Sequence, residues 1–537
     1  MNFDWHARYP SVRLPLFARN VVSTSHPMAA QVGLSLLQRG GNAVDAAIGT
    51  AAAMTVLEPC SNGLGSDAFC ILWDGRQLHG LNASGPAPAA WTLDYFRRKY
   101  GDARQPPVRG WDSVTVPGAV AAWVELSRRF GKLPFGDLLG PAIEIAERGY
   151  AVPVVVQEKW AAAIADLKGL PGFAETFMPR GRAPGVGERF TFPGAARALA
   201  AIAKTQGAAF YGGEIAAAAA AHAASHGAAM RVADFAAFSP EWVEPIGMDV
   251  YGHRLHQIPP NGQGIAALIA LGILQHVDIA AHGVDSAAAQ HLQIEAMKLG
   301  FADTYAHVAD RIAMRRSVQE MLDPQYLKQR AALIDPKRAQ VFGEGHADKG
   351  GTIYLTAADE RGMMVSFIQS NYMGFGSGVV LPEWGLSLQN RGHAFSLDPA
   401  SPNCVAPRKR PFHTIIPGFL TKDGLPQMSF GVMGANMQPQ GHVQTLVRML
   451  LYRQQPQAAC DAPRWRFNQG LSLNVEASMA DTTTRELLGL GHRIEVIQDS
   501  YQDFGAGQFI WRLGNPSMEG YVAASDPRRD GQAAGYG

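Results

Sequence analysis

The stretch Lys349-Gly350-Gly351-Thr352-Ile353-Tyr354-Leu355-Thr356-Ala357-Ala358 carries the strongest signal for the fold of this chain. Two glycines precede residues 352–358, whose composition favours an extended strand. The turn residues 359–362 follow, and a second apolar run occupies residues 363–370. This order predicts a β-hairpin with Thr352 at its open end.

Thr352 also has a possible chemical role. If the backbone were cut before it, Thr352 would carry both a hydroxyl nucleophile and a free α-amine. Such an amine titrates near about 7.7–8.0, whereas a lysine titrates near about 10.4, so only the amine accepts a proton readily at neutral pH. Gly351 leaves the carbonyl before Thr352 uncrowded. The spacing alone favours the simpler interpretation, in which the two glycines only give a hairpin a flexible start.

The composition describes a globular protein. The chain has 537 residues, of which 47% are hydrophobic and 17% are charged, enough for one large or two to three ordinary domains. With 47 basic and 46 acidic residues, the net charge of +1 gives no reason to expect nucleic acid or an anionic membrane as a partner. A small-molecule ligand is the better expectation.

The N-terminus and the cysteines indicate the compartment. The first ten residues lack the basic start and apolar run of a secretory signal, so we expect a cytoplasmic protein. The four cysteines are far apart and form no Cys-x-x-Cys pair. They predict neither a disulfide framework nor a zinc site, and we expect no metal and no cofactor.

Helical spacing dominates the first part of the chain and strand signals dominate from about Gly350 onward. The expected helical regions are 28–57 with a break at 40–42, 119–151 with a break near 131–134, and 195–229. Apolar segments at 413–420 and 427–432 are expected to extend the sheet of the hairpin, and 444–452 to form a helix that covers it. These elements predict an α+β layered core in one compact body.

Local motifs narrow the chemistry. The chain has no Gly-x-Ser-x-Gly elbow, no His-Glu-x-x-His pair and no phosphate-binding Gly-x-x-x-x-Gly-Lys-Ser/Thr loop. The glycine-rich residues 374–378 lack a following helix, so a turn is favoured there over a phosphate cradle. The segment 431–436 lies between an expected strand and an expected helix, where it fits either an oxyanion-binding turn or an ordinary tight turn.

Seven collinear segments, spread over nearly the whole chain, resemble the γ-glutamyltransferase family of N-terminal nucleophile (Ntn) hydrolases. They are Gly40–Ala47, Glu58–Ser66, Ser113–Gly118, Phe130–Phe135, Phe210–Gly213, Lys409–Pro411 and Ala524–Arg528. The resemblance implies a four-layer αββα sandwich made from a precursor that cuts itself between Gly351 and Thr352. The large subunit would be 1–351 and the small subunit 352–537, with 537 − 351 = 186 residues. A dimer of these heterodimers is a further option.

The resemblance also assigns the catalytic residues. Thr352 aligns with the nucleophile, and Ser370 takes the place of a threonine that hydrogen-bonds to it. Gly434 and Ala435 fall on the glycine pair whose N–H groups form the oxyanion hole. Because those donors are backbone groups, an alanine is expected to be tolerated if its φ is negative.

The substrate pocket departs from the family. Ser84 stands where the family has an arginine that holds a γ-glutamyl α-carboxylate, and Ala394 stands where it has an aspartate that holds the α-amine. Losing charge-assisted bonds of about 1.5–3 kcal/mol each predicts weak or absent γ-glutamyl recognition.

Other pocket positions are also replaced. Tyr372 occupies an asparagine position, His413 and Thr414 occupy a serine pair, and Arg391 occupies a glutamine position. The planar guanidinium of Arg391 suits a carboxylate clamp, although an ordinary arginine at the core edge fits the alignment equally well. His393 and two further histidines, His413 and His442, fit either an assisting or a structural role.

The segment between Phe395 and Lys409 is shorter than the lid of some family members, which predicts an open or differently covered pocket. Together with the segments around His393, His413 and His442, it resembles the branch that includes oxamate amidohydrolase. The leading hypothesis is a hydrolase of a small amide, with possible acyl-transfer ability, that forms an acyl-enzyme on Thr352. The alternatives are an authentic glutathione hydrolase/γ-glutamyltransferase with a rewritten pocket and, from another class, an inactive binding or scaffold protein.

Overall fold

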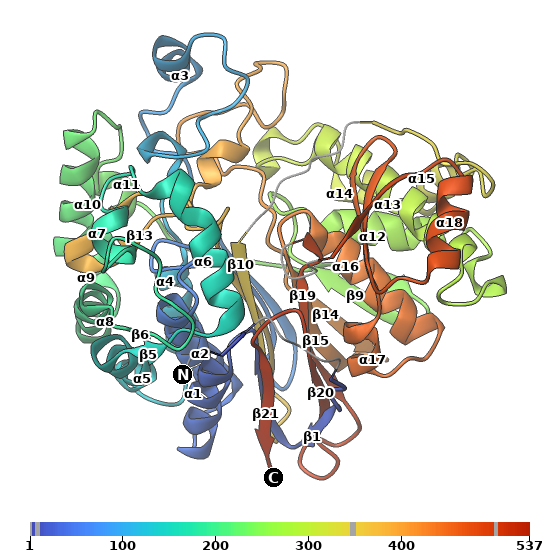
Figure 1. The fold of residues 1–537 in the computed structure, drawn as a ribbon, viewed down its shortest axis with the longest axis horizontal. Helices are drawn as coiled ribbons and strands as arrows, with labels where there is room; N and C mark the ends of the chain where they lie inside the picture. Colours follow the sequence, from blue (N-terminus) through green and yellow to red (C-terminus); the bar gives the residue numbers. More distant parts are fainter. Residues whose placement is uncertain (1–2, 6–10, 344–350, 499–502) are drawn as a thin grey trace.

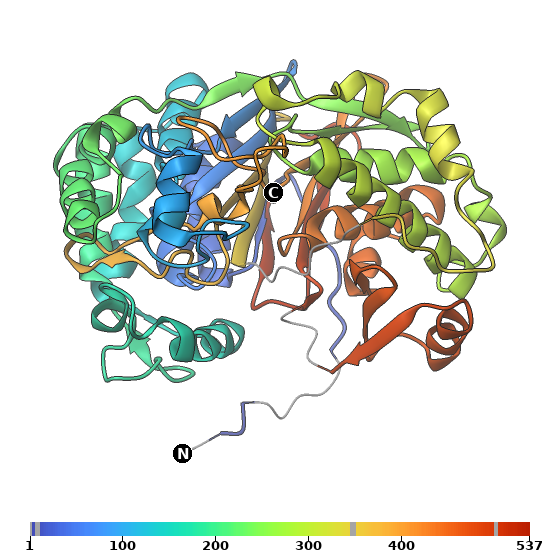
Figure 2. The ribbon, with the colours of Figure 1, turned by 90° about the horizontal axis from the view of Figure 1, so that it is seen from above.

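The computed structural model describes residues 3–5, 11–343, 351–498 and 503–537. Lys349 and Gly350 of the stretch quoted above lie outside these residues. The described part of the chain forms four layers, with two β-sheets face to face in the middle and helices on both outer sides (Figure 1, Figure 2). This is the expected αββα sandwich.

The first sheet contains the predicted hairpin at its centre. Within the described residues it has seven strands in the order β21-β2-β10-β11-β3-β4-β7. The strands are β2 (Asn20–Thr24), β3 (Asp67–Trp73), β4 (Leu78–Ala83), β7 (Glu241–Val243), β10 (Gly351–Ala358), β11 (Met364–Tyr372) and β21 (Gln532–Tyr536). Every residue of β10 and β11 is buried, because a sheet covers one face of the hairpin and helices cover the other.

The second sheet faces the first. Its order, within the same described residues, is β1-β20-β19-β15-β14-β9-β8. The strands are β1 (Leu16–Ala18), β8 (Ile246–Val250), β9 (His253–Gln257), β14 (Gly418–Lys422), β15 (Leu425–Met433), β19 (Ala506–Arg512) and β20 (Tyr521–Ser525).

The hairpin is confirmed, but two expectations about the sheets are wrong. The strands β14 and β15 do not extend the sheet of the hairpin; they belong to the facing sheet. The first part of the chain is also less purely helical than expected, because it supplies strands to both sheets. These strands were missed since both of their faces are covered, so β3 reads as a continuous apolar run without alternation.

Two helix pairs match the sequence signals. The helices α1 (Pro27–Gln38) and α2 (Ala43–Leu57) are separated at Gly40, whose φ is +89°. Asn42 and Asp45 form a capping box that starts α2. The helices α4 (Ala119–Phe130) and α5 (Phe135–Arg148) are separated at the predicted break.

The predicted helical region 195–229 is divided into three. It contains α8 (Pro193–Thr205), α9 (Ala208–Tyr211) and α10 (Glu214–Ser225). Gly207, with φ at +85°, separates the first two. The helix predicted at 444–452 begins earlier, as α16 (Met437–Leu446), and continues as a π-helical turn at Val447–Leu451.

The outer face of the second sheet is covered by α12 (Gly264–Leu274), α13 (Ala287–His307) and α16. The remaining helices are α3 (Leu93–Tyr100), α6 (Val154–Leu167), α7 (Phe173–Phe177), α11 (Val232–Ala236), α14 (Val318–Met321), α15 (Pro324–Ala331), α17 (Pro456–Asp461) and α18 (Asp481–Gly489). The strands of the described residues that lie outside the two large sheets are short. They are β5 (Tyr150–Ala151), β6 (Arg189–Phe190), β12 (Val380–Leu381), β13 (Leu386–Ser387), β16 (Trp465–Gln469), β17 (Ser472–Glu476) and β18 (Arg493–Ile497). Of the helices in this described part, none is long and apolar enough to cross a membrane.

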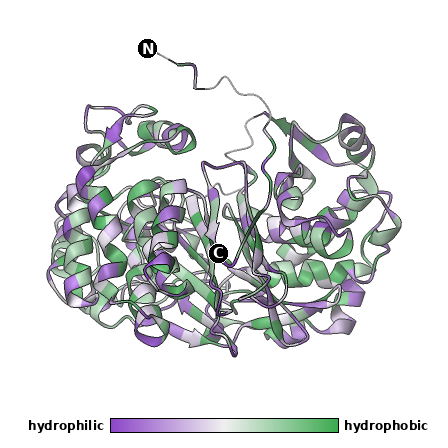
Figure 3. Cartoon of the chain, turned by 90° about the horizontal axis from the view of Figure 1, so that it is seen from below, coloured by the Kyte–Doolittle hydropathy of each residue, from purple (hydrophilic) through white to green (hydrophobic). Residues whose placement is uncertain are grey.

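The hydrophobic core follows the layers. One cluster packs the first sheet against its helices, a second packs α12 and α13 against the second sheet, and a third lies between the sheets. Tyr354, Ile368 and Phe419 belong to the third cluster. Hydrophobic segments accordingly occur both on the helices and along the strands between them (Figure 3).

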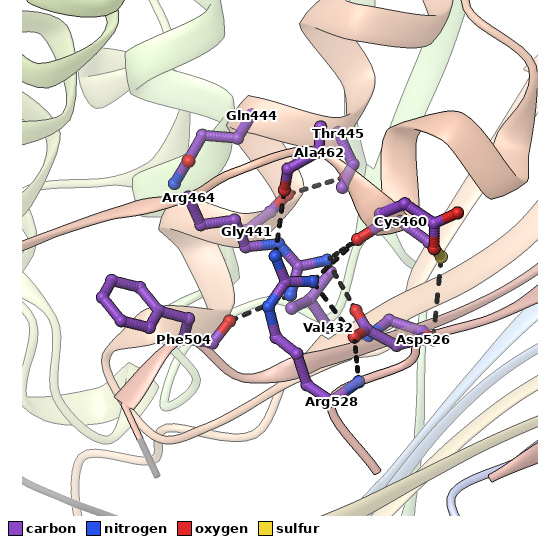
Figure 4. A network of polar contacts seen from close by, with 12 residues as sticks. Val432, Gly441, Gln444, Thr445, Cys460, Ala462, Arg464, Phe504, Asp526 and Arg528 are labelled. Atoms are coloured by element: carbon purple, nitrogen blue, oxygen red, sulfur yellow. Dashed lines mark hydrogen bonds and ion pairs between the residues drawn. The ribbon is translucent and has the colours of Figure 1, made fainter. Parts of the chain in front are cut away.

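A buried ion network ties the end of β20 to the small sheet of β16, β17 and β18 (Figure 4). Asp526 accepts a hydrogen bond from Arg464 Nη2 at 2.7 Å and from Arg528 Nη1 at 3.1 Å. Arg528 also donates to Glu476 at the end of β17, at 2.5 Å. Asp526 and Arg528 belong to the family segment Ala524–Arg528, which therefore marks a structural anchor.

The two guanidinium groups determine the charge of Asp526. Burial alone would raise its pKa, but Arg464 and Arg528 outweigh burial and lower the pKa from 3.8 to about 2. Because the pKa of Asp526 is lower in the folded than in the unfolded protein, its ionised carboxylate stabilises the fold. This contribution to the free energy of unfolding is complete above the unfolded pKa of about 3.9 and is lost as pH falls through the folded pKa.

We predict that Asp526→Asn lowers the free energy of unfolding by about 3–5 kcal/mol, because it leaves two buried guanidinium groups undercompensated. Urea unfolding at pH 7 measures this change. The matched control is Asp249→Asn, which removes the exposed partner of Arg254 and is expected to cost less than about 1 kcal/mol. Equal effects of the two substitutions would contradict the anchor role.

Candidate active site

Thr352 lies at the buried start of β10, directly beside Ser370 of β11. Its Oγ1 is 3.0 Å from Ser370 Oγ, and Ser370 Oγ is 2.8 Å from the carbonyl oxygen of Gly351. The N–H of Tyr372 donates to Ser370 Oγ at 2.8 Å. Ser370 Oγ thus accepts one bond and has its own proton available for the Gly351 carbonyl or for the Thr352 hydroxyl.

These contacts surround the peptide bond between Gly351 and Thr352. The hydrogen bond from Ser370 polarises the Gly351 carbonyl, and the Thr352 hydroxyl belongs to the residue that follows this carbonyl in the chain. A Cβ at position 351 would lie 2.8 Å from Cys60 O and 3.0 Å from Ser61 Cα, closer than real side chains approach backbone atoms. Only glycine fits before Thr352.

The turn at Gly434 follows β15 on the facing sheet. Thr356 Oγ1 lies 2.6 Å from Ser429 Oγ, and a Cβ on Gly431 would lie 2.5 Å from the Tyr354 ring. These contacts show that β15, which leads into the turn, packs against β10 at Tyr354 and Thr356.

The orientation of the turn is set by α16. The carbonyls of Gly434 and Ala435 accept the N–H groups of Met437 and Gln438, at 2.9 and 3.1 Å. In a trans peptide the next N–H points opposite to the carbonyl, so the Ala435 N–H points away from α16. Gln263 Nε2 also donates to the Ala435 carbonyl, at 3.0 Å, and so fixes the turn.

Ala435 does not have the negative φ that was expected to make an alanine tolerable at this position. Its φ is +50°, in the left-handed region, and Gly434 has φ at +123°. An alanine is accommodated there at a cost of about 1–2 kcal/mol, because its Cβ approaches a carbonyl oxygen. The surrounding contacts, including the bond from Gln263, hold the turn in this conformation.

Arg391 is completely buried and presents an unfilled edge. Its Nη1 donates to Thr414 Oγ1 at 2.7 Å, and its guanidinium lies 4.5 Å from the centre of the Tyr372 ring. Its Nε and Nη2 have no hydrogen-bond partner among the described residues. Burial lowers the pKa of Arg391 to about 10 while Asp67 raises it, so the side chain is charged at neutral pH.

A cavity of about 770 Å³ is lined by Tyr372, whereas Arg391, Thr414 and Thr352 are not among its lining residues. Tyr372, Ala394 and Asn436 form its wall nearest to Ser370 and the Gly434–Ala435 turn. The rest of the wall is Arg104, Gln105, Tyr305, Val308, Ser396, Asp398, Ser401, Asn403 and Phe412. The short segment after Phe395 thus covers part of the cavity. A larger cavity of about 970 Å³ is lined by residues 243–247, 314–320 and 322–324 among others, and no predicted site residue lines it.

Two predicted pocket residues belong to closed networks. His413 Nε2 lies 3.1 Å from Asp67 Oδ2, and burial together with Arg391 keeps the pKa of His413 well below 6.5. Ser84 Oγ donates to Asn82 Oδ1 at 2.7 Å. His413 is therefore a neutral neighbour of Asp67, and within the described residues neither His413 nor Ser84 forms a hydrogen bond with Thr352.

The other two histidines are also engaged elsewhere. His393 Nδ1 bonds to the carbonyl of Pro106 at 2.7 Å. His442 lies inside the second layer, 3.1 Å from Gln257 Nε2, and burial lowers its pKa to about 3. Both contacts fit the structural role.

Sequence reasoning missed two residues of this site. Gln263 joins the Thr414 carbonyl, at 2.6 Å, to the Ala435 carbonyl. Asp67 is a fully buried carboxyl whose pKa is raised to about 7 by burial, against the opposing effect of Arg391. The signal that could have revealed Gln263 is its position between two glycines, in the segment that joins β9 to α12. The signal that could have revealed Asp67 is a charged residue at the start of an apolar run.

A buried threonine at the start of a central strand, two facing sheets and two outer helical layers define the class: this is an Ntn hydrolase. The gamma-glutamyltranspeptidase family model matches residues 29–536. The chain belongs to the gamma-glutamyltranspeptidase family. It is an amide hydrolase and acyltransferase of the Ntn type, made as one precursor that is processed into two subunits.

Relatives agree on processing and differ in substrate. The chain is 36% identical to the oxamate amidohydrolase proenzyme of Klebsiella pneumoniae, over 95% of this chain and 97% of that one. It is 35% identical to the glutathione hydrolase-like YwrD proenzyme of Bacillus subtilis, over 96% and 98%. The crystal structure of a cephalosporin acylase from Bacillus halodurans superposes with a TM-score of 0.95 at 45% identity, covering 100% of both chains.

We predict that Ala435→Gly raises the free energy of unfolding by about 1 kcal/mol, because glycine adopts a positive φ without strain. Ala217→Gly, at an exposed position inside α10, is the control and is expected to lower it by about 0.5–1 kcal/mol. Chemical denaturation compares the two. A loss of stability in Ala435→Gly as large as in the control would contradict the strained turn.

Proposed function

We propose that Thr352 is the catalytic nucleophile and that the precursor cuts itself between Gly351 and Thr352. The products are a large subunit of residues 1–351 and a small subunit of residues 352–537. The observation that carries this proposal is the position of the Ser370 hydroxyl, 2.8 Å from the Gly351 carbonyl and 3.0 Å from the Thr352 hydroxyl.

This geometry supports self-cleavage. The Thr352 oxygen attacks the Gly351 carbonyl carbon, and Ser370 donates to the carbonyl oxygen as it gains negative charge. The bond from Gly351 to the Thr352 nitrogen then breaks, and the nitrogen takes up the hydroxyl proton. Water hydrolyses the resulting ester, which frees the Gly351 carboxylate, the Thr352 hydroxyl and the Thr352 α-amine.

Turnover reuses the same threonine. Its α-amine accepts the hydroxyl proton while Oγ1 attacks the amide carbonyl of the substrate. The N–H groups of the Gly434–Ala435 turn stabilise the oxyanion, and the leaving amine receives the proton. Water then attacks the acyl-enzyme and releases an acid; an acceptor amine in place of water gives acyl transfer.

Arg391 supports a substrate that carries a carboxylate on its acyl side. The unfilled Nε and Nη2 of its guanidinium match the two oxygens of a carboxylate. A γ-glutamyl group would also need an acidic partner for its ammonium, but the family's aspartate position is Ala394. Among the described residues that line the cavity, Asp398 carries a carboxylate, and one of its oxygens accepts the N–H of Ala400.

The proposed substrate is therefore a small acid amide, with oxamate as the simplest case. The Klebsiella relative named for oxamate supports this assignment. The glutathione hydrolase-like name of the Bacillus subtilis relative keeps γ-glutamyl compounds as the second candidate. The cavity of about 770 Å³ also leaves room for acyl groups larger than oxamate.

We predict that Thr352→Ala abolishes both self-cleavage and amide turnover. Ser370→Ala is expected to slow cleavage by about 10²–10³-fold, the usual effect of removing one donor to a developing oxyanion. Ser370→Thr, which restores the family residue, is expected to retain cleavage. Gel electrophoresis over time measures the fraction cut.

The matched control is Ser366→Ala, which removes another buried hydroxyl of β11, one that contacts Tyr354 Oη at 2.7 Å. This variant is expected to cleave at the wild-type rate. Cleavage that is equally slow in Ser366→Ala would assign the Ser370 effect to general loss of packing. A cleaved and active Thr352→Ala would refute the nucleophile.

We predict that Arg391→Gln lowers kcat/KM for oxamate by about 10²-fold, because it removes charge-assisted bonds of about 1.5–3 kcal/mol each. Turnover of acetamide, which has no carboxylate, is expected to change little. Assays on cleaved enzyme with oxamate, acetamide and γ-glutamyl-p-nitroanilide measure this discrimination. Preferential γ-glutamyl turnover by the wild type would favour the second candidate.

A further inference from the structure

A second group of chemically capable side chains lies away from Thr352, on helix α13 (Ala287–His307). His291 and Glu295 are four residues apart, so they share one face of this helix. His492, which follows α18, lies close to both of them. All three side chains are buried, with exposed fractions of 0%, 0% and 3%.

The three residues converge on one point. Ligand atoms of His291, Glu295 and His492 all lie within 4.8 Å of one another. His291 Nδ1 is 2.8 Å from His492 Nε2, and His291 Nε2 is 2.9 Å from the carbonyl of Asp335. Since only Nε2 of His291 faces a carbonyl acceptor, it carries the proton, and Nδ1 presents a lone pair toward His492.

These contacts leave lone pairs on His492 and Glu295 unused. His492 Nδ1 is buried and has no hydrogen-bond partner among the described residues. The Glu295 oxygens accept from Lys298 Nζ at 2.6 Å and from the Gln340 N–H at 3.1 Å. A carboxylate has about four lone-pair sites, so these two bonds leave Glu295 able to accept another partner.

We propose that His291, Glu295 and His492 form a binding site for a divalent transition-metal ion of the zinc type. Two imidazole nitrogens and one carboxylate are ligands that such ions prefer, and three protein ligands leave a fourth position for water. The Asp335 carbonyl accepts the other N–H of His291, as partners of metal-binding histidines usually do, and so fixes the tautomer and orientation of this ring.

Lys298 opposes the metal and so gives the site a testable property. Its ammonium group neutralises Glu295 at 2.6 Å. A dication beside Glu295 would be repelled by this like charge, so Lys298 weakens metal binding. Replacement of Lys298 by methionine, of similar length and without charge, is therefore expected to tighten binding.

The position of the site gives the metal a structural consequence. His291 and Glu295 precede Thr352 in the chain, whereas His492 follows it. If the cut at Thr352 occurs as proposed above, the metal joins the large subunit to the small one. The binding of the metal itself does not depend on the cut, and the experiment below separates the two.

The test uses the purified full-length protein, stripped with EDTA and titrated with ZnCl₂ by calorimetry, with thermal melts at each concentration. The wild type is expected to bind one zinc ion at this site and to melt at higher temperature with zinc. His492→Gln keeps an N–H for His291 but lacks the imidazole, and is expected to weaken zinc binding by about tenfold or more. Lys298→Met is expected to tighten it by about tenfold.

The control is His226→Gln, because the ring of the exposed His226 lies 4.4 Å from that of the half-buried His222 and the two offer a competing pair. This variant is expected to retain the zinc-dependent melting shift. The proposal is overturned if the folded wild type shows no zinc binding, or if binding is lost in His226→Gln and kept in His492→Gln. The fraction cut, read from a gel of the same samples, reports on Thr352 independently.

Discussion

The hydroxyl of Ser370 is the contact on which the rest of the site depends. It lies between the Gly351 carbonyl and the Thr352 hydroxyl, and the Tyr372 N–H holds it from the other side. This arrangement requires β10 and β11 to be adjacent and buried, as they are at the centre of the first sheet. The two sheets and their helical layers can thus be understood as the support that excludes water from one peptide bond.

Burial also determines the electrostatics of the pocket. Arg391 remains charged although no fully ionised carboxylate is paired with it. Thr414 accepts a hydrogen bond from only one of its nitrogens, and burial raises the pKa of the neighbouring Asp67 to about 7. A buried guanidinium with an unfilled edge is costly unless a ligand completes it. The carboxylate of the proposed substrate would complete this edge of Arg391.

How much could be predicted from the sequence depended on the range of each signal. The hairpin at Thr352 and the break before α2 follow local patterns, and both were found. Strands such as β3, covered on both faces, carry no alternation and were missed. The positive φ of Ala435 and the bridge made by Gln263 depend on contacts between distant segments, and the glycines that flank Gln263 mark its position but not its partners. The grouping of His291 with His492, 201 positions apart, is of the same kind.

The central claim is that Thr352 carries the acyl group during turnover. Acid quenching of the wild-type enzyme during steady-state hydrolysis, followed by mass spectrometry of the fragments, tests it directly. The account predicts a small chain that begins at Thr352 and bears the mass of the substrate acyl group on that residue. An adduct on another residue, or an uncut chain of 57.6 kDa that still hydrolyses the amide, would contradict it.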